Sequence, residues 1–485
     1  MNEIKKIEIF SSLFYSKFGV QPSDIVKLPP SGSYREYYRL KEGVNSAIAA
    51  YNEDPKENEA FVYLTRHFFS KGLPVPELYG EKLENDIYLL EDLGDDMLLS
   101  FMEKHNYYKY GVNSEIIDAY KQTLEQLPKF QVEGTTDLDY SVCYPRHAFD
   151  RQSMMWDLNY FKYYFLKLSR VPFNEQLLED DFNTLCDHLL SADCNYFLYR
   201  DFQSRNIMLK NKQPYFIDYQ GGRKGSLHYD IASILFEAKT HLPAHVRNEL
   251  LEHYLDSLGK QLDISREKFM EHYYGYVYIR MMQAMGAYGF RGLYEKKPLF
   301  LQSIPPVLSH LEWLVDNVEL PVKVPELSKV WRTLVESDYL RIIARSHFSL
   351  TVNVNSFSYR RGIPIDESAN GGGFVFDCRA IHNPGKYEQY KNLSGTDPEV
   401  ITYLEKDPEL TGFLNDVFSI TDRSIVKYMD RGFTSLMVNF GCTGGQHRSV
   451  FAAEMLKKHL MEKFGIMNLT VIVRHREQEM KKDLD

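Results

Sequence analysis

The spacing of apolar residues in the first hundred positions predicts a small lobe rich in β-structure. Residues 1–20 interrupt their apolar positions with charged ones, which is typical of an amphipathic helix rather than of a secretory signal. Residues 25–52 favour extended segments on either side of a proline-rich turn, and residues 56–71 favour a helix that ends at glycine and proline. The run 87–94 is typical of a strand that enters a connector. We therefore expect a small lobe over about residues 1–95.

Beyond this lobe the pattern changes twice. Helical periodicity dominates residues 96–340 and is broken by a strand-turn-strand stretch at 196–219. Residues 350–355 then alternate apolar and polar side chains, as a half-buried strand does. We predict a helical lobe that completes a first domain at residues 1–340, followed by a compact α/β domain at residues 346–485. Within the second domain we expect a strand at 435–440, a helix at 448–464 and a last strand at 469–473.

Composition is typical of a folded protein rather than of a disordered or membrane-spanning one. The 485 residues are enough for two or three domains, and the 44% hydrophobic and 26% charged contents are ordinary. No run of about 20 uncharged apolar residues occurs, so we expect no membrane span. The five cysteines are scattered without metal-ligand spacing, which fits a reducing, cytoplasmic location. The net charge of −10 argues against a general electrostatic attraction to nucleic acid.

Two short segments carry the residues that phosphoryl transfer needs. Asp201 and Asn206 lie close together in one segment, and Asp218 ends a probable strand after a hairpin. Phosphoryl transfer needs the acceptor hydroxyl aligned and the phosphate charge neutralised. Asp201 can accept the proton of the hydroxyl as catalytic base, while Asn206 and Asp218 offer the oxygen ligands that Mg²⁺ prefers. One Asp–Asn pair of this spacing is common by chance, so the prediction depends on all of the elements standing in order.

These segments resemble the aminoglycoside-phosphotransferase-like kinases, a branch of the protein-kinase fold. The resemblance implies a two-lobed α+β fold, ATP as the phosphate donor, and support of the catalytic loop by Arg200 and by Asp230. It narrows to the anomeric amino-sugar kinases, which phosphorylate N-acetylmuramate or N-acetylglucosamine at C1. It spans about residues 5–335, and the pieces that carry it are Ser33–Leu40, Gly72–Pro76, Leu90–Asp95, Arg280–Gly286 and Arg291–Gly292.

The same resemblance implies where the nucleotide binds. Backbone groups from Glu91 to Leu93 would form the adenine hinge, and Ser31, Gly32 and Ser33 would approach the phosphates. A simple turn at Gly32 and a solvated acidic hinge are the alternative interpretations.

Two positions depart from the family pattern. Tyr199 stands where kinases usually carry a histidine, a change expected to alter the support of the loop rather than the chemistry of Asp201. The stretch 47–51 lacks the lysine that normally binds the ATP phosphates, so Arg35 or Arg39 would have to supply that charge. Either arginine is also compatible with an ordinary surface position.

The surface that would bind a sugar is less visible. The aromatic stretch 156–164, which follows Asp150 and Arg151, would suit a wall on which a sugar stacks. Leu158, Phe161 and Phe165 share one helical face, however, and this favours core packing for most of the stretch.

A glycine-rich loop between a strand and a helix marks the C-terminal domain. Amides at a helix N-terminus bind anions and an arginine adds a charged fork, so residues 440–449 outline a phosphate site. The segment resembles the C-terminal domain of RapZ, a bacterial RNA adapter that senses glucosamine-6-phosphate. Further matching pieces are Ser356–Pro364, Phe376–Arg379, His382–Pro384, Ser394–Asp397 and Arg474–Arg476. The resemblance implies a pocket for a phosphorylated amino sugar made by Cys442, Thr443, Gly444, Gly445, His447, Arg448, Ser449, Arg379 and His382.

Two other functions compete for this loop and domain. Cys442 and Arg448 satisfy the C-x5-R spacing of cysteine phosphatases, but Gly441 replaces the usual preceding histidine and no acid is assignable. RNA binding is not favoured, because residues 347–485 hold 17 Lys and Arg against 18 Asp and Glu and so lack a basic footprint.

The sequence as a whole predicts an ATP- and Mg²⁺-dependent kinase that acts on the anomeric hydroxyl of an N-acetylated amino sugar. Its C-terminal domain is expected to sense a phosphorylated amino sugar. The alternatives are a kinase of another small alcohol or antibiotic, and an RNA- or protein-binding adapter whose kinase half is degenerate.

Overall fold

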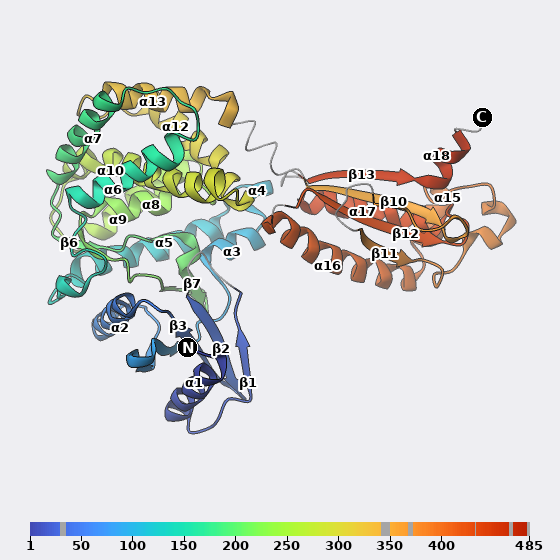
Figure 1. The fold of residues 1–485 in the computed structure, drawn as a ribbon, viewed down its shortest axis with the longest axis horizontal. Coiled ribbons are helices and arrows are strands. Elements are labelled where there is room, and N and C mark those ends of the chain that lie inside the picture. Colours follow the sequence, from blue (N-terminus) through green and yellow to red (C-terminus); the bar gives the residue numbers. More distant parts are fainter. Residues whose placement is uncertain (30–34, 341–349, 367–371, 432, 465–468, 483–485) are drawn as a thin grey trace. The chain divides into compact units, whose positions relative to one another are not determined.

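The computed structural model contains two compact units. It describes residues 1–29, 35–340, 350–366, 372–431, 433–464 and 469–482. One unit is made of Met1–Ala287 and Pro306–Glu336, and the other of Tyr288–Pro305 and Ser337–Asp485 (Figure 1). The predicted domain boundary, between residues 340 and 346, lies outside the described residues and stays a prediction.

The small lobe of the first unit is an antiparallel five-stranded sheet of order β1-β2-β3-β5-β4. Apolar residues of the first helix, among them Phe10 and Phe14, pack against sheet residues that include Leu40 and Leu89. The amphipathic helix and the three strands expected from the sequence are therefore confirmed. The elements are α1 (Glu3–Phe18), β1 (Asp24–Lys27), β2 (Glu36–Glu42), β3 (Asn45–Tyr51), α2 (Pro55–Ser70), β4 (Leu78–Lys82) and β5 (Ile87–Glu91).

The rest of the first unit is mainly helical, as predicted. Two short hairpin-like sheets, β6 with β9 and β7 with β8, interrupt the helices and hold the segment that contains Asp201 between β6 and β7. The strands are β6 (Tyr196–Leu198), β7 (Ile207–Lys210), β8 (Gln213–Phe216) and β9 (Arg223–Gly225). The helices are α3 (Leu98–Lys104), α4 (Tyr107–Tyr110), α5 (Ser114–Pro128), α6 (Arg151–Tyr160), α7 (Glu175–Leu190), α8 (His228–Leu235), α9 (Ala244–Leu258), α10 (Arg266–Tyr288), α12 (Ile304–Asn317) and α13 (Pro325–Glu336).

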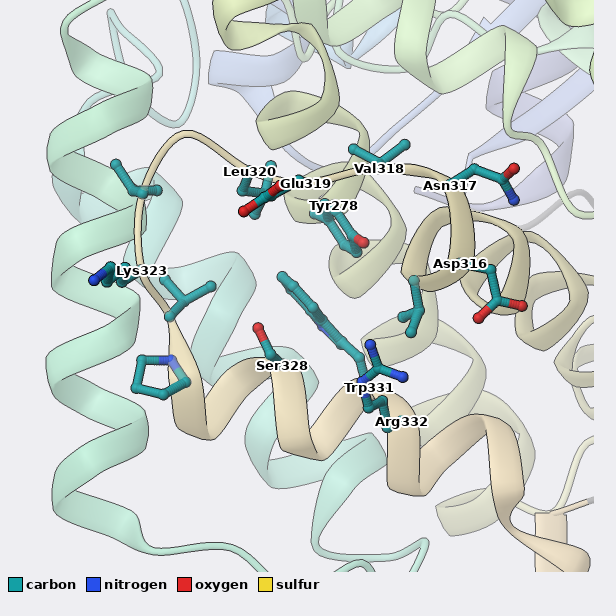
Figure 2. Close-up of a pocket in the computed structure, with 14 residues that line it drawn as sticks. Tyr278, Asp316, Asn317, Val318, Glu319, Leu320, Lys323, Ser328, Trp331 and Arg332 are labelled. Carbon is teal, nitrogen blue, oxygen red and sulfur yellow. The ribbon is translucent and has the colours of Figure 1, made fainter.

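A pocket of about 700 Å³ opens in this helical lobe (Figure 2). It lies between α10, the end of α12, the segment 318–324 and α13. The stacked rings of Tyr278 and Trp331, with centroids 3.9 Å apart, form part of its lining. Its lining contains none of the residues that the sequence marks for catalysis or nucleotide binding, so the pocket is separate from the candidate kinase site.

The second unit contains a parallel four-stranded sheet of order β11-β12-β10-β13. Apolar residues of α16 and α17, such as Val417 and Leu456, form one core with Val352, Val354 and Val438 of the sheet. The three elements expected from the sequence for this domain are confirmed. The elements of this unit are β10 (Leu350–Ser358), β11 (Gly373–Asp377), β12 (Ser435–Cys442), β13 (Leu469–His475), α11 (Pro298–Leu301), α15 (Pro398–Leu404), α16 (Pro408–Arg431), α17 (Arg448–Phe464) and α18 (Arg476–Lys482).

Across the described ranges, every helix is too short or too polar to cross a lipid bilayer.

Close contact between α10 and the end of α6 depends on Gly286. A Cβ atom placed there would lie 2.7 Å from Cδ1 of Tyr160 and 3.0 Å from the backbone nitrogen of Phe161. We expect Gly286→Ala to lower the free energy of unfolding by about 1–3 kcal/mol, because backbone atoms cannot yield without moving a helix. Gly259→Ala, at the end of α9, meets only contacts of 3.4 Å or longer and should change stability by less than about 0.5 kcal/mol. Chemical denaturation of the two variants compares them, and equal stabilities would contradict the packing argument.

Candidate functional site

The loop between β6 and β7 is held by buried carboxylates on its backbone. Asp230 accepts hydrogen bonds from the backbone N–H groups of Tyr199 and Arg200, at 2.8 and 3.0 Å. Glu237, just beyond α8, accepts from the N–H of Ser204 at 2.9 Å. These anchors lie on both sides of Asp201 and fix the direction in which its side chain leaves the loop.

Tyr199 supports the same loop through its side chain. Its buried hydroxyl donates to the backbone carbonyl of Ile217, the residue before Asp218, at 2.6 Å. The tyrosine thus ties the loop to the segment that carries Asp218, which agrees with the expectation that it changes loop support.

Arg200 turns away from the reacting side of the loop. Its backbone has a positive φ of 79°, and its guanidinium forms a two-pronged contact with the carboxylate of Asp157 at 2.6 and 2.7 Å. The hydroxyl of Tyr229 accepts a further bond at 2.6 Å, and the guanidinium lies 5.1 Å from the ring centroids of Phe149 and Tyr229. The loop is therefore attached to α6 as well as to α8.

Asp201, Asn206 and Asp218 come together in one place. The amide of Asn206 donates to the backbone carbonyl of Asp201 at 2.8 Å and to the carboxylate of Asp218 at 3.1 Å. Gln220 donates to the other oxygen of Asp218 at 2.8 Å. Because the amide nitrogen of Asn206 makes both of these bonds, its amide oxygen is left to bind another group. This oxygen and the Asp218 carboxylate are two neighbouring oxygen ligands of the kind that Mg²⁺ prefers.

The carboxylate of Asp201 is available to accept a hydrogen bond from a substrate hydroxyl. No residue in the described ranges donates a hydrogen bond to it. Burial and the neighbouring charge of Asp218 raise the pKa of Asp201 above its ordinary value. Burial also raises the pKa of Asp230, to about 7, although its two backbone hydrogen bonds favour the charged form.

The two candidate arginines of the small lobe have different surroundings. Arg35 is 5% exposed, donates to Glu57 of α2 at 2.6 Å, and has its guanidinium 3.6 Å from the carboxylate of Asp218. Arg39 instead pairs with Asp92 and Asp95, each at 2.8 Å. Only Arg35 lies beside the Asp218 cluster.

The expected adenine hinge follows the end of β5. Glu91 is bonded through its backbone N–H to Glu77 at 2.9 Å, and its carboxylate pairs with Lys210. Neither backbone group of the buried Leu93 is hydrogen bonded to a residue within the described ranges, which leaves both for a ligand. Ser31, Gly32 and Ser33 lie outside the described residues.

The aromatic stretch, which runs along α6 and the helical turn Phe161–Leu166 after it, divides as its helical face suggested. Leu158, Phe161 and Phe165 are fully buried. Trp156 and Tyr163 are about half exposed, at 48% and 49%. The wall proposed for a sugar is therefore reduced to the exposed aromatic rings.

The glycine-rich loop of the second unit runs from Cys442, the end of β12, to the first residue of α17. The thiol of Cys442 accepts a bond from the N–H of Gly445 and lies next to the hydroxyl of Ser449, both at 3.2 Å. Burial raises the pKa of Cys442, but these hydrogen bonds and the charge of Arg448 outweigh it and the net shift is downward. Gly445 has a φ of 67°, and a Cβ there would lie 2.8 Å from the nitrogen of Ser358.

Parts of this loop remain available to an anion. The backbone N–H groups of Gly444, Gln446 and His447 donate to no acceptor in the part of the chain that the structure describes. Thr443 and Gly444 are exposed, while His447 is buried and its ring contacts the carbonyl of Tyr390 at 2.8 Å. The loop thus offers a set of backbone amide donors close together in the chain.

Arg448 does not extend freely from this loop. Its Nη1 atom donates to the carbonyl oxygens of Arg379 and Ile381 at 2.9 and 2.7 Å. Arg379 is exposed and pairs with Asp377 at 2.6 Å, and the exposed His382 follows Ile381 directly. Arg448, the first residue of α17, is therefore tied to the backbone of the segment that carries Arg379 and His382.

Three residues that organise the kinase site were not found from the sequence. Glu57 pairs with Arg35, Asp157 pairs with Arg200, and Glu237 anchors Ser204. Glu57 carried a usable signal, because it is an acid in the first turn of the helix that follows β3. Asp157 and Glu237 gave none, since their partners are 43 and 33 residues away in the chain.

Two family models match the chain. The model of the phosphotransferase enzyme family matches residues 26–268, which are 243 of the 485 residues. The model of the RapZ C-terminal domain matches residues 350–479.

Curated relatives match about a quarter of the chain. Nucleotide-binding proteins of Ruegeria pomeroyi and Nitrosomonas europaea are 39% and 40% identical to it over 133 residues. That stretch is 27% of this chain and 44% and 43% of theirs, so the chain spans less than half the length of these relatives.

Solved structures align with about two thirds of the chain at low identity. A choline kinase of Streptococcus pneumoniae covers 64% of this chain and 100% of its own, with 14% identity and a TM-score of 0.42. A choline kinase of Cryptosporidium parvum covers 68% and 100%, with 10% identity and a TM-score of 0.47. Scores of this size say nothing about the substrate.

The predicted fold class, a kinase-like α+β fold followed by a RapZ-like α/β domain, is confirmed by the family matches and by the parallel sheet of the second unit. The chain therefore belongs to the phosphotransferase enzyme family and carries a RapZ-like domain at its C-terminal end.

Proposed function

We propose that the first unit is an ATP- and Mg²⁺-dependent kinase that phosphorylates the anomeric hydroxyl of an N-acetylated amino sugar. The observation that carries the kinase proposal is the cluster of Asp201, Asn206 and Asp218. One carboxylate is open to an acceptor, and beside it a carboxylate and an amide are held together at 3.1 Å. These are the parts that phosphoryl transfer requires.

Asp201 acts as the general base. A raised pKa brings a carboxylate closer to the pH at which proton transfer is efficient. As the acceptor oxygen attacks the terminal phosphorus of ATP, its proton passes to Asp201 and ADP leaves. Asp230 and Glu237 hold the loop so that this carboxylate meets the hydroxyl.

Asn206 and Asp218 suit a magnesium ion. Their donor set is all oxygen, which matches the preference of Mg²⁺ and excludes the softer metals that select thiolate or imidazole. Bound there, Mg²⁺ would neutralise charge on the phosphates.

Arg35 supplies the phosphate-binding charge in place of the missing lysine. In protein kinases that lysine pairs with a glutamate of the following helix. Arg35 makes the equivalent pair with Glu57 of α2 and faces Asp218, whereas Arg39 is neutralised by two acids near the hinge.

The amino-sugar substrate is supported by sequence resemblance and by one exposed aromatic ring. The pieces around Arg35, the hinge and α10 resemble the anomeric amino-sugar kinases, and the exposed Trp156 offers a ring for stacking. A screen of amino sugars with MgATP, with the product identified by phosphorus NMR, tests the proposal. Phosphorylation of a different small alcohol alone would replace the substrate but keep the kinase.

A second function is favoured for the RapZ-like domain. The unpaired amides of Gly444, Gln446 and His447 and the nearby Arg379 suit the phosphate of an amino-sugar phosphate, which this domain would hold or sense. The five cysteines are unbridged, which supports a cytoplasmic setting for both functions.

Loss of the base and loss of the metal ligand should be separable. Asp201→Asn is expected to leave MgATP binding nearly intact and to lower turnover by ~10²–10⁴-fold, since proton acceptance is lost. Asp218→Ala should abolish Mg²⁺-dependent nucleotide binding. Steady-state kinetics and calorimetry with and without Mg²⁺ measure both effects. Unchanged turnover in Asp201→Asn would remove this residue from the mechanism.

The two arginines of the small lobe provide a matched comparison. Arg35→Ala should weaken MgATP binding by roughly 10- to 100-fold, the equivalent of a lost hydrogen bond between charged groups, and Arg35→Lys should recover part of it. Arg39→Ala should change it far less, because that side chain is already paired with acids. Nucleotide titration checks the order, with thermal unfolding as a control for folding. A larger loss in Arg39→Ala than in Arg35→Ala would reverse the assignment.

The two candidate functions of the RapZ-like domain differ in whether they need the thiol of Cys442. A phosphatase needs it as the nucleophile, whereas a binding site does not. If the loop binds, Cys442→Ser should still bind glucosamine-6-phosphate, because the amides are kept. Arg379→Ala, which removes the exposed cation near the loop, should lose about 1.5–3 kcal/mol of binding free energy. Calorimetry and a phosphate-release assay on the full chain distinguish the cases. Phosphate release that vanishes in Cys442→Ser would establish a phosphatase, and the absence of both binding and release would withdraw the sensing role.

A further inference from the structure

Two consecutive glycines follow the Asp218 segment, and the fold explains only one of them. Gly222 is required by packing, since a Cβ there would lie 2.2 Å from the ring of Phe197 and 2.8 Å from the carbonyl oxygen of Tyr219. Its N–H also closes a turn onto that carbonyl at 2.8 Å. A side chain at position 222 would displace a buried aromatic ring.

Gly221 meets no such restriction. Its backbone is outside the left-handed region, and a Cβ there would make only ordinary contacts, 3.4 Å from Oδ2 of Asp201 and 3.8 Å from Cγ of Arg200. The position is partly exposed. The fold would therefore accept a side chain at 221, and the atom that the side chain would crowd most is the oxygen of the proposed base.

The backbone at Gly221 is nevertheless held firmly. Arg223, which is 6% exposed, donates to the carbonyl of Gly221 from both Nε and Nη2, at 3.0 and 2.9 Å. Within the described ranges no carboxylate lies within 4.0 Å of this guanidinium. Burial and the nearby Arg200 lower the pKa of Arg223 to about 10. Burying a cation without an acidic partner costs free energy. Because the Gly221 carbonyl is the main polar contact of Arg223, we assign to Arg223 the role of holding that carbonyl in place.

We propose that Gly221 keeps one flank of Asp201 clear for the acceptor, and that Arg223 is the positioning residue that fixes this flank. The inference rests on the proposed kinase function. It predicts that transfer to the proposed amino sugar, whose hydroxyl sits on a substituted ring carbon, depends on this clearance. The substituents next to such a carbon would lie close to the Asp201 carboxylate and need space there. Water or a primary alcohol has no such substituents and needs less space.

A series of side chains of increasing size at position 221 tests the proposal. Three quantities are measured on the full chain: MgATP affinity, hydrolysis of ATP by water, and transfer to N-acetylglucosamine. Gly221→Ala should lower transfer by about 10- to 100-fold, the scale of a misplaced acceptor, with hydrolysis and MgATP affinity within about two-fold of wild type. Gly221→Phe should suppress hydrolysis as well and still bind MgATP. Gly259→Ala serves as a glycine control that should change none of the three.

Arg223 is tested by separating KM from kcat. Arg223→Met should raise the KM for the acceptor while MgATP affinity holds, and Arg223→Lys, which keeps one donor, should recover part of the loss. An equal fall in every property would mean a structural role only and would overturn the positioning assignment.

The outcomes also separate this inference from the proposed function. If the wild type hydrolyses ATP but phosphorylates no sugar, the amino-sugar proposal fails, and Gly221→Phe still decides whether this flank admits the nucleophile. Unchanged transfer and hydrolysis in Gly221→Phe would overturn the open-flank proposal. A wild type that neither binds nor hydrolyses MgATP would overturn both.

Discussion

The geometry of the kinase site depends on one buried carboxylate, that of Asp230. It accepts the two backbone N–H groups that immediately precede Asp201, and a backbone held in this way leaves the next side chain only one direction. Burial disfavours the charged carboxylate and is the main reason that the pKa of Asp230 is raised, to about 7. The hydrogen bonds from Tyr199 and Arg200 favour its charged form and so offset part of that cost.

Charge around the candidate kinase site is distributed by the same rule of compensation. Arg35, Arg39 and Arg200 each face at least one acid, and the acids come from different elements: α2, the hinge and α6. The Arg35–Glu57 pair connects the start of β2 to α2, and the Arg39–Asp92 pair connects β2 to the hinge. The Arg200–Asp157 pair connects the loop that carries Asp201 to α6. Arg223 differs from these three arginines, because its guanidinium donates to the backbone carbonyl of Gly221 instead of pairing with an acid.

The sequence was informative where a function depends on neighbours along the chain. Asp201, Asn206 and Asp218 were predicted together because a short loop and a hairpin keep them close, and the structure brings them within hydrogen-bond distance. The α17 helix was predicted with its observed bounds, since glycines precede it and its apolar period is regular. The Arg35–Glu57 and Arg200–Asp157 pairs join positions 22 and 43 residues apart, and no local pattern specifies such contacts. Arg448 was expected to point at an anion, and its tie to the carbonyls of Arg379 and Ile381 is likewise set by tertiary contacts.

Replacing the usual histidine of the catalytic loop by Tyr199 has a consequence for the conditions under which the loop keeps its shape. An imidazole changes its charge between about pH 5 and 8, so a hydrogen bond made by a histidine at this position would depend on pH within the physiological range. Burial raises the pKa of Tyr199 well above its ordinary value, so its phenol remains a neutral donor to Ile217 throughout that range. The hydrogen bond from Tyr199 to Ile217 is therefore insensitive to acidification across that range.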